Sequence, residues 1–175
     1  MAPFGLTYAV YVAIVGGSML AFDPPPATPS VTGTPANLWH LSVGRNDPKK
    51  GTVGQDGIVT LEYRPETEIG WRFKPLYVVG ASVDGAAYIG AAVRKDYQLG
   101  PVQVTPFIGP VLYQSFASNA FNSKELIQFR TGFDVLVPIN KELSAGMGYY
   151  HVSNASLTNA SAGLDVTKVT LQYKF

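Results

Sequence analysis

From Asn37 to the carboxyl end, hydrophobic and polar residues alternate with a period of two, and turn-forming residues interrupt the alternation. Side chains of a β-strand point alternately to opposite faces, so this pattern predicts strands. The breaks hold turn sequences such as Asp84-Gly85 and Gly100-Pro101. The predicted strands are residues 37–45, 54–64, 75–83, 86–95, 101–113, 124–137, 142–153 and 165–175. Eight strands in about 139 residues fit an antiparallel up-and-down β-barrel.

The composition of the two strand faces indicates which face points inward. In the strand 124–137, one face is apolar and the other carries charges of both signs together with glycine, as in Ile127, Phe129, Phe133 and Val135 against Gln128, Arg130, Gly132 and Asp134. A narrow barrel interior filled by ion pairs suits the charged face, and hydrocarbon suits the aromatic-rich face. The sequence therefore favours a membrane β-barrel. The alternative is a two-sheet sandwich whose polar face meets water.

The amino-terminal segment differs from the rest of the chain. Residues 1–22 contain no charged side chain, and about 19 of them are mostly apolar, which is long enough for a spanning helix. A secretory signal peptide normally has a basic start, which this segment lacks. Residues 1–22 are therefore a signal peptide or an uncleaved membrane anchor helix. Residues 23–36 form a Pro-rich linker, and residues 37–175 form the β-barrel domain.

Composition excludes several function classes. The formal net charge is +1, so no electrostatic attraction to nucleic acid is expected. The chain has no cysteine, which excludes a disulfide framework, a thiolate metal site and a cysteine nucleophile. His40 has no second ligand nearby in the sequence and is expected to face the barrel interior. We therefore expect no cofactor and no metal, and eight strands leave no room for a pore.

One group of residues near the carboxyl end has the composition of a hydrolytic site. His151 and Ser153 lie two residues apart, so they share a strand face with Cα atoms about 6.6 Å apart. The next predicted strand returns antiparallel and brings Asp165 beside them. A nucleophile, a base and an acid then meet on the apolar face of one hairpin. The same residue types are also common at strand ends, so spacing alone leaves a structural role open.

The surrounding sequence resembles the lipid A 3-O-deacylase (PagL-like) family of bacterial outer-membrane esterases. The resemblance lies in four segments: Gln128–Gly132, Tyr149–Ser156, Gly163–Asp165 and Leu171–Phe175. It implies an outer-membrane barrel that hydrolyses the ester-linked 3-acyl chain of lipid A, the lipid part of lipopolysaccharide. The site would face membrane lipid. Ser153 would be the nucleophile, His151 the base, Asp165 the acid that orients it, and Asn154 an oxyanion support.

The chain departs from the family pattern at two positions. Asp165 stands where the family normally has Glu, and it is shorter by one methylene, about 1.5 Å. The contact to His151 then requires a shift of the strands. Ser161 stands where the family tends to have Asn beside the oxyanion, and losing such a support costs on the order of 100-fold in rate.

Two further interpretations follow from these features. In one, the β-domain is catalytically inactive, and residues 1–22 anchor it in the inner membrane with the domain in the periplasm. The natural place for such a protein is as an accessory subunit of a larger membrane complex, respiratory or photosynthetic. In the other, the chain is a structural outer-membrane barrel without enzymatic activity.

Overall fold

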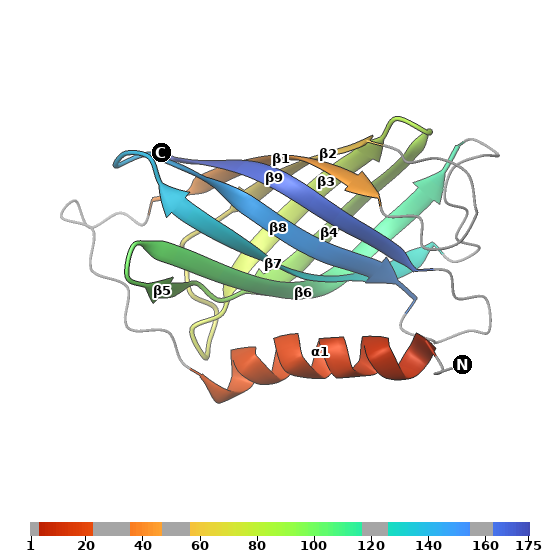
Figure 1. The fold of residues 1–175 in the computed structure, drawn as a ribbon, viewed down its shortest axis with the longest axis horizontal. Coiled ribbons are helices and arrows are strands. Elements are labelled where there is room, and N and C mark those ends of the chain that lie inside the picture. Colours follow the sequence, from red (N-terminus) through yellow and green to blue (C-terminus); the bar gives the residue numbers. More distant parts are fainter. Residues whose placement is uncertain (1–3, 23–35, 47–56, 117–125, 155–162) are drawn as a thin grey trace.

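The computed structural model describes residues 4–22, 36–46, 57–116, 126–154 and 163–175, with helix side chains described from residue 13 onward. The fold is a closed antiparallel barrel with one helix outside it (Figure 1). Its strands are β1 (Leu38–Asn46), β2 (Gly57–Arg64), β3 (Lys74–Ser82), β4 (Ala86–Arg94), β6 (Val102–Ser115), β7 (Ile127–Pro138), β8 (Leu143–Ser153) and β9 (Leu164–Lys174). Each strand pairs with its sequence neighbour, β1 pairs with β9, and the pairing of β4 with β6 completes the ring. The prediction of an eight-stranded up-and-down barrel is confirmed.

The structure contains a short ninth strand that the sequence pattern did not predict. β5 (Tyr97–Leu99) pairs with the first residues of β6, next to the stretch of β6 that pairs with β4. It therefore continues the line of β4 after a break at Lys95 and Asp96. The turn into β6 follows at Gly100, whose φ of 61° is readily adopted by glycine. The break places the Asp96 carboxylate within reach of basic side chains on two barrel strands.

The outer wall has the surface expected of a membrane barrel. Four aromatic residues form one cross-strand row at the end where the chain terminates: Tyr77, Tyr63, Trp39 and Tyr173. Trp39 lies 5.3 Å from Tyr63 between ring centroids, and its ring stacks on Phe175 at 6.2 Å. Exposed Leu, Val and Met side chains cover the outer wall between this row and the opposite end of the barrel. An aromatic row beside an apolar band is typical of barrels that cross a lipid bilayer.

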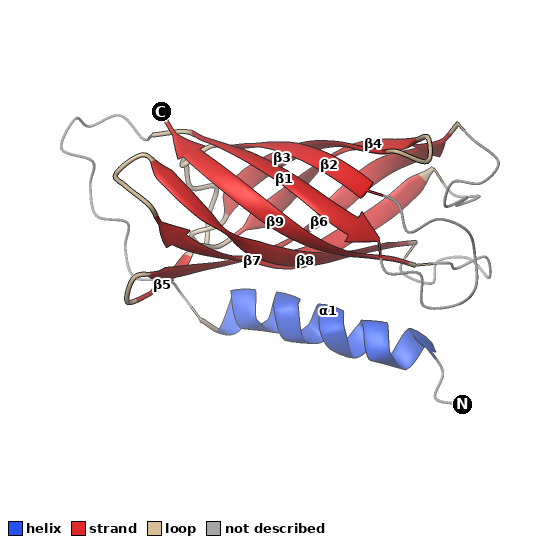
Figure 2. Cartoon of the chain, turned by 45° about the horizontal axis from the view of Figure 1, so that its top comes forward, coloured by secondary structure: helices blue, strands red, loops and turns tan. Residues whose placement is uncertain are grey.

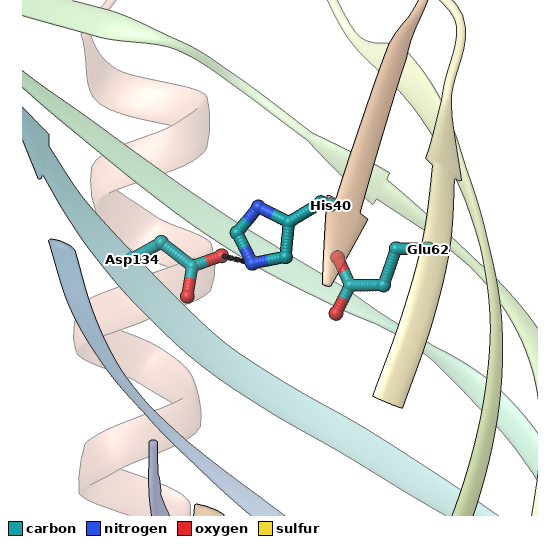
Figure 3. Close-up of side chains that lie close together, drawn as sticks. All are labelled: His40, Glu62 and Asp134. Atoms are coloured by element: carbon teal, nitrogen blue, oxygen red, sulfur yellow. Dashed lines mark ion pairs between the residues drawn. The ribbon is translucent and has the colours of Figure 1, made fainter. Parts of the chain in front are cut away.

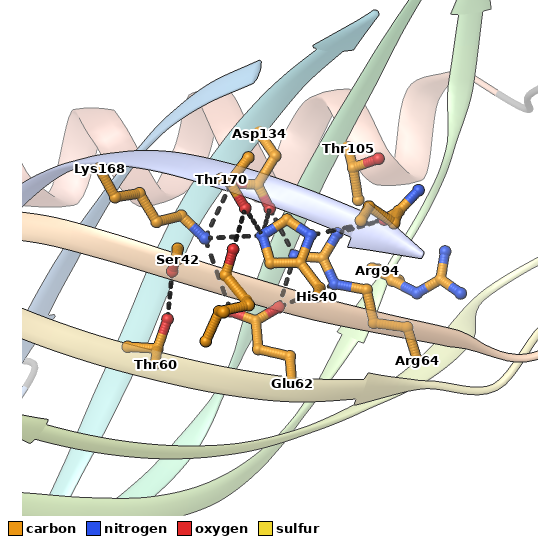
Figure 4. Close-up of polar contacts among 12 residues, drawn as sticks. His40, Ser42, Thr60, Glu62, Arg64, Arg94, Thr105, Asp134, Lys168 and Thr170 are labelled. Atoms are coloured by element: carbon orange, nitrogen blue, oxygen red, sulfur yellow. Dashed lines mark hydrogen bonds and ion pairs between the residues drawn. The ribbon is translucent and has the colours of Figure 1, made fainter. Parts of the chain in front are cut away.

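The interior contains a layer of buried charges, as the alternation predicted. Glu62, Arg64, Arg130, Asp134 and Lys168 are each at most 2% exposed. Asp134 contacts Arg64 and Lys168, and Glu62 contacts Arg64 and Lys168 (Figure 4). Glu62 also contacts Arg130, so each carboxylate has at least two cationic partners. Removing one member of a buried ion pair leaves the other uncompensated and costs about 3–5 kcal/mol. These mutual contacts let charges occupy the lumen.

A layer of buried aromatic side chains fills the lumen between the charged layer and the barrel end at which β8 ends. Its main members, Phe107, Tyr88 and Tyr150, are at most 3% exposed. The guanidinium of Arg130 lies 4.4 Å from the ring centroid of Phe107 and 4.3 Å from that of Tyr150, which joins the two layers through cation–π contacts. Tyr88 donates a hydrogen bond to the Tyr150 hydroxyl at 3.1 Å. The side chains fill the barrel, as the strand number predicted.

The helix α1 (Phe4–Ala21) lies lengthwise along the outside of the barrel, against β6 and β7 (Figure 2). Val15 and Met19 are buried in this contact. The Tyr97 hydroxyl of β5 donates to the Ser18 carbonyl at 3.2 Å and to the Phe22 carbonyl at 2.7 Å. Among the residues described, no helix combines the length and the hydropathy needed to cross a membrane.

Candidate active site

The candidate base and acid meet across one rung of the β8–β9 ladder. His151 and Asp165 are direct Cα partners in this antiparallel pair, and partners of this kind have Cβ atoms about 4.5–5.5 Å apart. The Nδ1 atom of His151 lies 2.7 Å from Oδ1 of Asp165. Both side chains belong to the outward-facing parity, and both are partly exposed. Asp165 therefore contacts His151 although its side chain is one methylene shorter than the Glu that the family normally has.

The hydrogen bond from His151 to Asp165 sets the state of the imidazole. An ionised carboxylate only accepts hydrogen bonds, so Nδ1 carries the proton and donates it. The neutral ring then has its lone pair on Nε2, which is the atom a general base requires. Gly163 packs against the Cε1–Nε2 edge of the ring. A Cβ atom at this position would lie 2.8 Å from Nε2, so the close approach requires glycine.

The candidate nucleophile, Ser153, lies two residues after His151 and therefore on the same face of β8. Ser153 is the last residue of β8, and its Cα partner on β7 is Phe129. Ser153 is 4% exposed, which is more buried than its lipid-facing parity predicts. Asn154 follows it with the opposite parity and is 2% exposed. Ser161, the second expected oxyanion support, lies outside the described residues. The described part of the site thus comprises His151, Asp165, Ser153 and Asn154.

The structure adds Tyr149 to this group, which the sequence reasoning did not include. Tyr149 lies two residues before His151 on β8, and its hydroxyl donates to Oδ1 of Asp165. The same oxygen contacts His151, so the two side chains share one acceptor atom. The alternation already placed Tyr149 on the face of His151, and that shared parity was the available signal. Its hydrogen bond could not be foreseen because it depends on the strand register.

A second group of potential ligands lies inside the barrel and has a structural explanation. His40, Glu62 and Asp134 place one ligand atom each within 4.8 Å of one another (Figure 3). The prediction that His40 faces the interior is confirmed, since it is fully buried. Arg64, Arg130 and Lys168 already contact these carboxylates at 2.5–2.8 Å. A divalent cation here would meet three positive charges, so the cluster is suited to ion pairing rather than to metal binding.

Comparison with known proteins agrees with this geometry. The model of the family described as lipid A 3-O-deacylase (PagL) matches residues 59–174, well over half of the chain. The chain belongs to the lipid A 3-O-deacylase family. The matched region includes all of β3 to β9, and it contains His151, Ser153 and Asp165. A sequence search against curated proteins found no significant match.

Solved structures share the barrel of this lipid A 3-O-deacylase family member. The crystal structure of the outer-membrane enzyme PagL aligns with a TM-score of 0.57 and 14% identity, covering 78% of this chain and 98% of PagL. Neisserial surface protein A aligns with a TM-score of 0.56 and 11% identity, covering 80% and 96%. A de novo designed transmembrane β-barrel aligns with a TM-score of 0.54 and 12% identity, covering 81% and 97%. Family and fold together assign the protein to the outer membrane.

Proposed function

We propose that the protein is an esterase that hydrolyses the ester-linked acyl chain at the 3-position of lipid A. The observation that carries this proposal is the 2.7 Å contact between His151 Nδ1 and Asp165 Oδ1 on the lipid-facing wall of the barrel. Membership in the lipid A 3-O-deacylase family supports the choice of substrate. The partners are then lipid A, as part of lipopolysaccharide, and the surrounding membrane lipid. No cofactor or metal takes part in this proposal.

In the proposed mechanism, Ser153 Oγ attacks the ester carbonyl carbon while Nε2 of His151 takes the hydroxyl proton. The tetrahedral intermediate collapses, the bond to the sugar 3-oxygen breaks, and His151 returns the proton to that oxygen. Water then attacks the acyl-serine with the same imidazole as base. This second step releases the fatty acid and regenerates the serine. Asp165 holds the ring and stabilises the imidazolium that forms in each step.

The oxyanion of the intermediate needs hydrogen-bond donors, and this proposal assigns that role to Asn154 with Ser161. Asn154 directly follows Ser153 in the chain, and its side-chain amide can donate hydrogen bonds. Removing one such donor typically reduces kcat by about 100-fold to 1,000-fold. Replacing Asn154 by Ala is therefore expected to lower turnover by this amount.

Replacing Ser153 by Ala tests the proposal. The variant and the wild type are reconstituted in vesicles containing lipopolysaccharide, and released 3-hydroxy fatty acid is measured by mass spectrometry. Ser153→Ala is expected to abolish release while the barrel still folds. Ser144→Ala, on the same strand at its other end, is the matched control and should release fatty acid at the wild-type rate. Wild-type release from Ser153→Ala would refute the proposed nucleophile.

The second candidate function is that of an inactive accessory subunit that retains residues 1–22, and the packing of α1 on the barrel wall is the observation that favours it. The intact mass of protein purified from its native membrane separates the two proposals. Loss of roughly the first 18–27 residues indicates export and cleavage, as the esterase proposal requires. A mass that retains residues 1–22, together with no fatty acid release, supports the accessory subunit.

A further inference from the structure

Tyr149 is placed by the barrel register to reach the acid of the proposed site. Its Cα partners are Phe133 on β7 and Thr167 on β9, whereas the partner of His151 is Asp165. Tyr149 and Asp165 are therefore diagonal neighbours on the same face, at a spacing that a long aromatic side chain can span. The tyrosine hydroxyl completes this span and donates to Oδ1 of Asp165.

The ring of Tyr149 is itself held in place by the wall. Its centroid lies 6.3 Å from that of Phe133, at an interplanar angle of 40°, within the range of favourable aromatic pairs. Side chains at this parity otherwise meet an apolar environment, where a phenyl ring would serve equally well. The distinctive part of Tyr149 is therefore its hydroxyl, because that group is hydrogen-bonded to a carboxylate of the site.

Because Tyr149 and His151 share one acceptor atom, Tyr149 can affect how Asp165 orients the His151 imidazole. Oδ1 of Asp165 receives the Tyr149 hydroxyl and also lies 2.7 Å from Nδ1 of His151. An aspartate with a single partner can rotate its carboxylate away from the imidazole. A second donor on the same oxygen opposes that rotation and keeps the proton on Nδ1. The short side chain at position 165 then remains a working acid.

We propose that Tyr149 is a positioning residue whose hydroxyl holds the Asp165 carboxylate on His151, so that an aspartate performs the orienting role. This inference rests on the proposed esterase function. Tyr149 itself touches no reacting atom. It acts through Asp165 on the imidazole, and a longer acid at position 165 should make it unnecessary because that carboxylate has more reach.

The kinetic test is Tyr149→Phe, which removes the hydroxyl and keeps the ring. Hydrogen bonds to charged groups contribute enough that kcat should fall by about tenfold to a hundredfold, with KM unchanged. Adding Asp165→Glu to Tyr149→Phe should restore most of the lost kcat. Tyr77→Phe, in the aromatic row at the far end of the barrel, is the control and should keep wild-type kcat. Wild-type kcat in Tyr149→Phe, or no recovery in the double variant, would overturn the inference.

A spectroscopic test does not depend on turnover. The chain has two histidines, so the ¹⁵N shifts of the His151 imidazole can be assigned by comparison with a His40→Gln variant. The wild type should show one tautomer, protonated on Nδ1, and Tyr149→Phe should show a mixture. Identical spectra would contradict the role of Tyr149. An inactive wild type that still shows this difference would instead refute only the esterase proposal.

Discussion

Replacing Gly163 by Ala is the sharpest perturbation of the proposed base. Gly163 lies just before β9 and directly against the imidazole of His151. The added methyl would lie 2.8 Å from Nε2 and closer still to Cε1, whereas ordinary contacts begin at 3.4 Å. The ring must therefore move. It cannot simply rotate away, because its Nδ1 atom is bound to Asp165.

The size of the effect follows from this geometry. Restoring ordinary contact requires a displacement of at least about 0.6 Å at Nε2, the difference between 2.8 and 3.4 Å, and a larger one at Cε1. Misplacement of a catalytic group by about 1 Å can cost on the order of 100-fold in rate. We expect kcat to fall by about tenfold to a hundredfold, equivalent to roughly 1.4–2.7 kcal/mol in the barrier.

The assay compares kcat and KM for fatty acid release in vesicles, alongside the denaturant midpoint of unfolding. Gly57→Ala is the matched control at the same end of the barrel, because its methyl would lie 3.8 Å from Val83 and make only ordinary contact. Gly163→Ala should lose kcat at nearly unchanged stability, and Gly57→Ala should keep both. Full turnover in Gly163→Ala would refute the assigned position of the base. An equal loss in Gly57→Ala would show that the effect is not specific to the imidazole.

Three further predictions concern the barrel itself. Glu62→Ala leaves two buried arginines without their shared carboxylate and should lower the free energy of unfolding by about 3–5 kcal/mol, measured by denaturant titration. Gly132→Ala puts a methyl 2.7 Å from the Phe107 ring and should destabilise the barrel by about 1–3 kcal/mol, seen as a lower unfolding midpoint. Burial would raise the pKa of Asp96, but its two basic partners outweigh burial and hold that pKa below its usual range. The resulting stability is present above the unfolded pKa of about 3.9 and is lost as pH falls through the lower folded value. The unfolding midpoint of the wild type should therefore fall more steeply below about pH 4 than that of Asp96→Asn.

Much of the fold is contained in the order of residue types along the chain. A period of two can only be satisfied by strands, and a polar face rich in large charges fits a closed lumen better than an open surface. This argument predicted eight barrel strands and the burial of Arg130 and Asp134. It also placed His151 and Asp165 on one hairpin, because consecutive antiparallel strands pair locally. The pattern did not predict β5, because three residues are too few to establish a period.

The particular partners of each side chain were decided by the closed barrel. Glu62 contacts Arg130 from 68 residues away, and Arg64 contacts Asp134 from 70 residues away, because closure brings opposite walls together across the lumen. Tyr149 reaches Asp165 because the register makes them diagonal neighbours. Alternation in a sequence specifies the face on which a residue lies. Register and closure specify which residue it meets there, and those depend on packing the whole ring of strands at once.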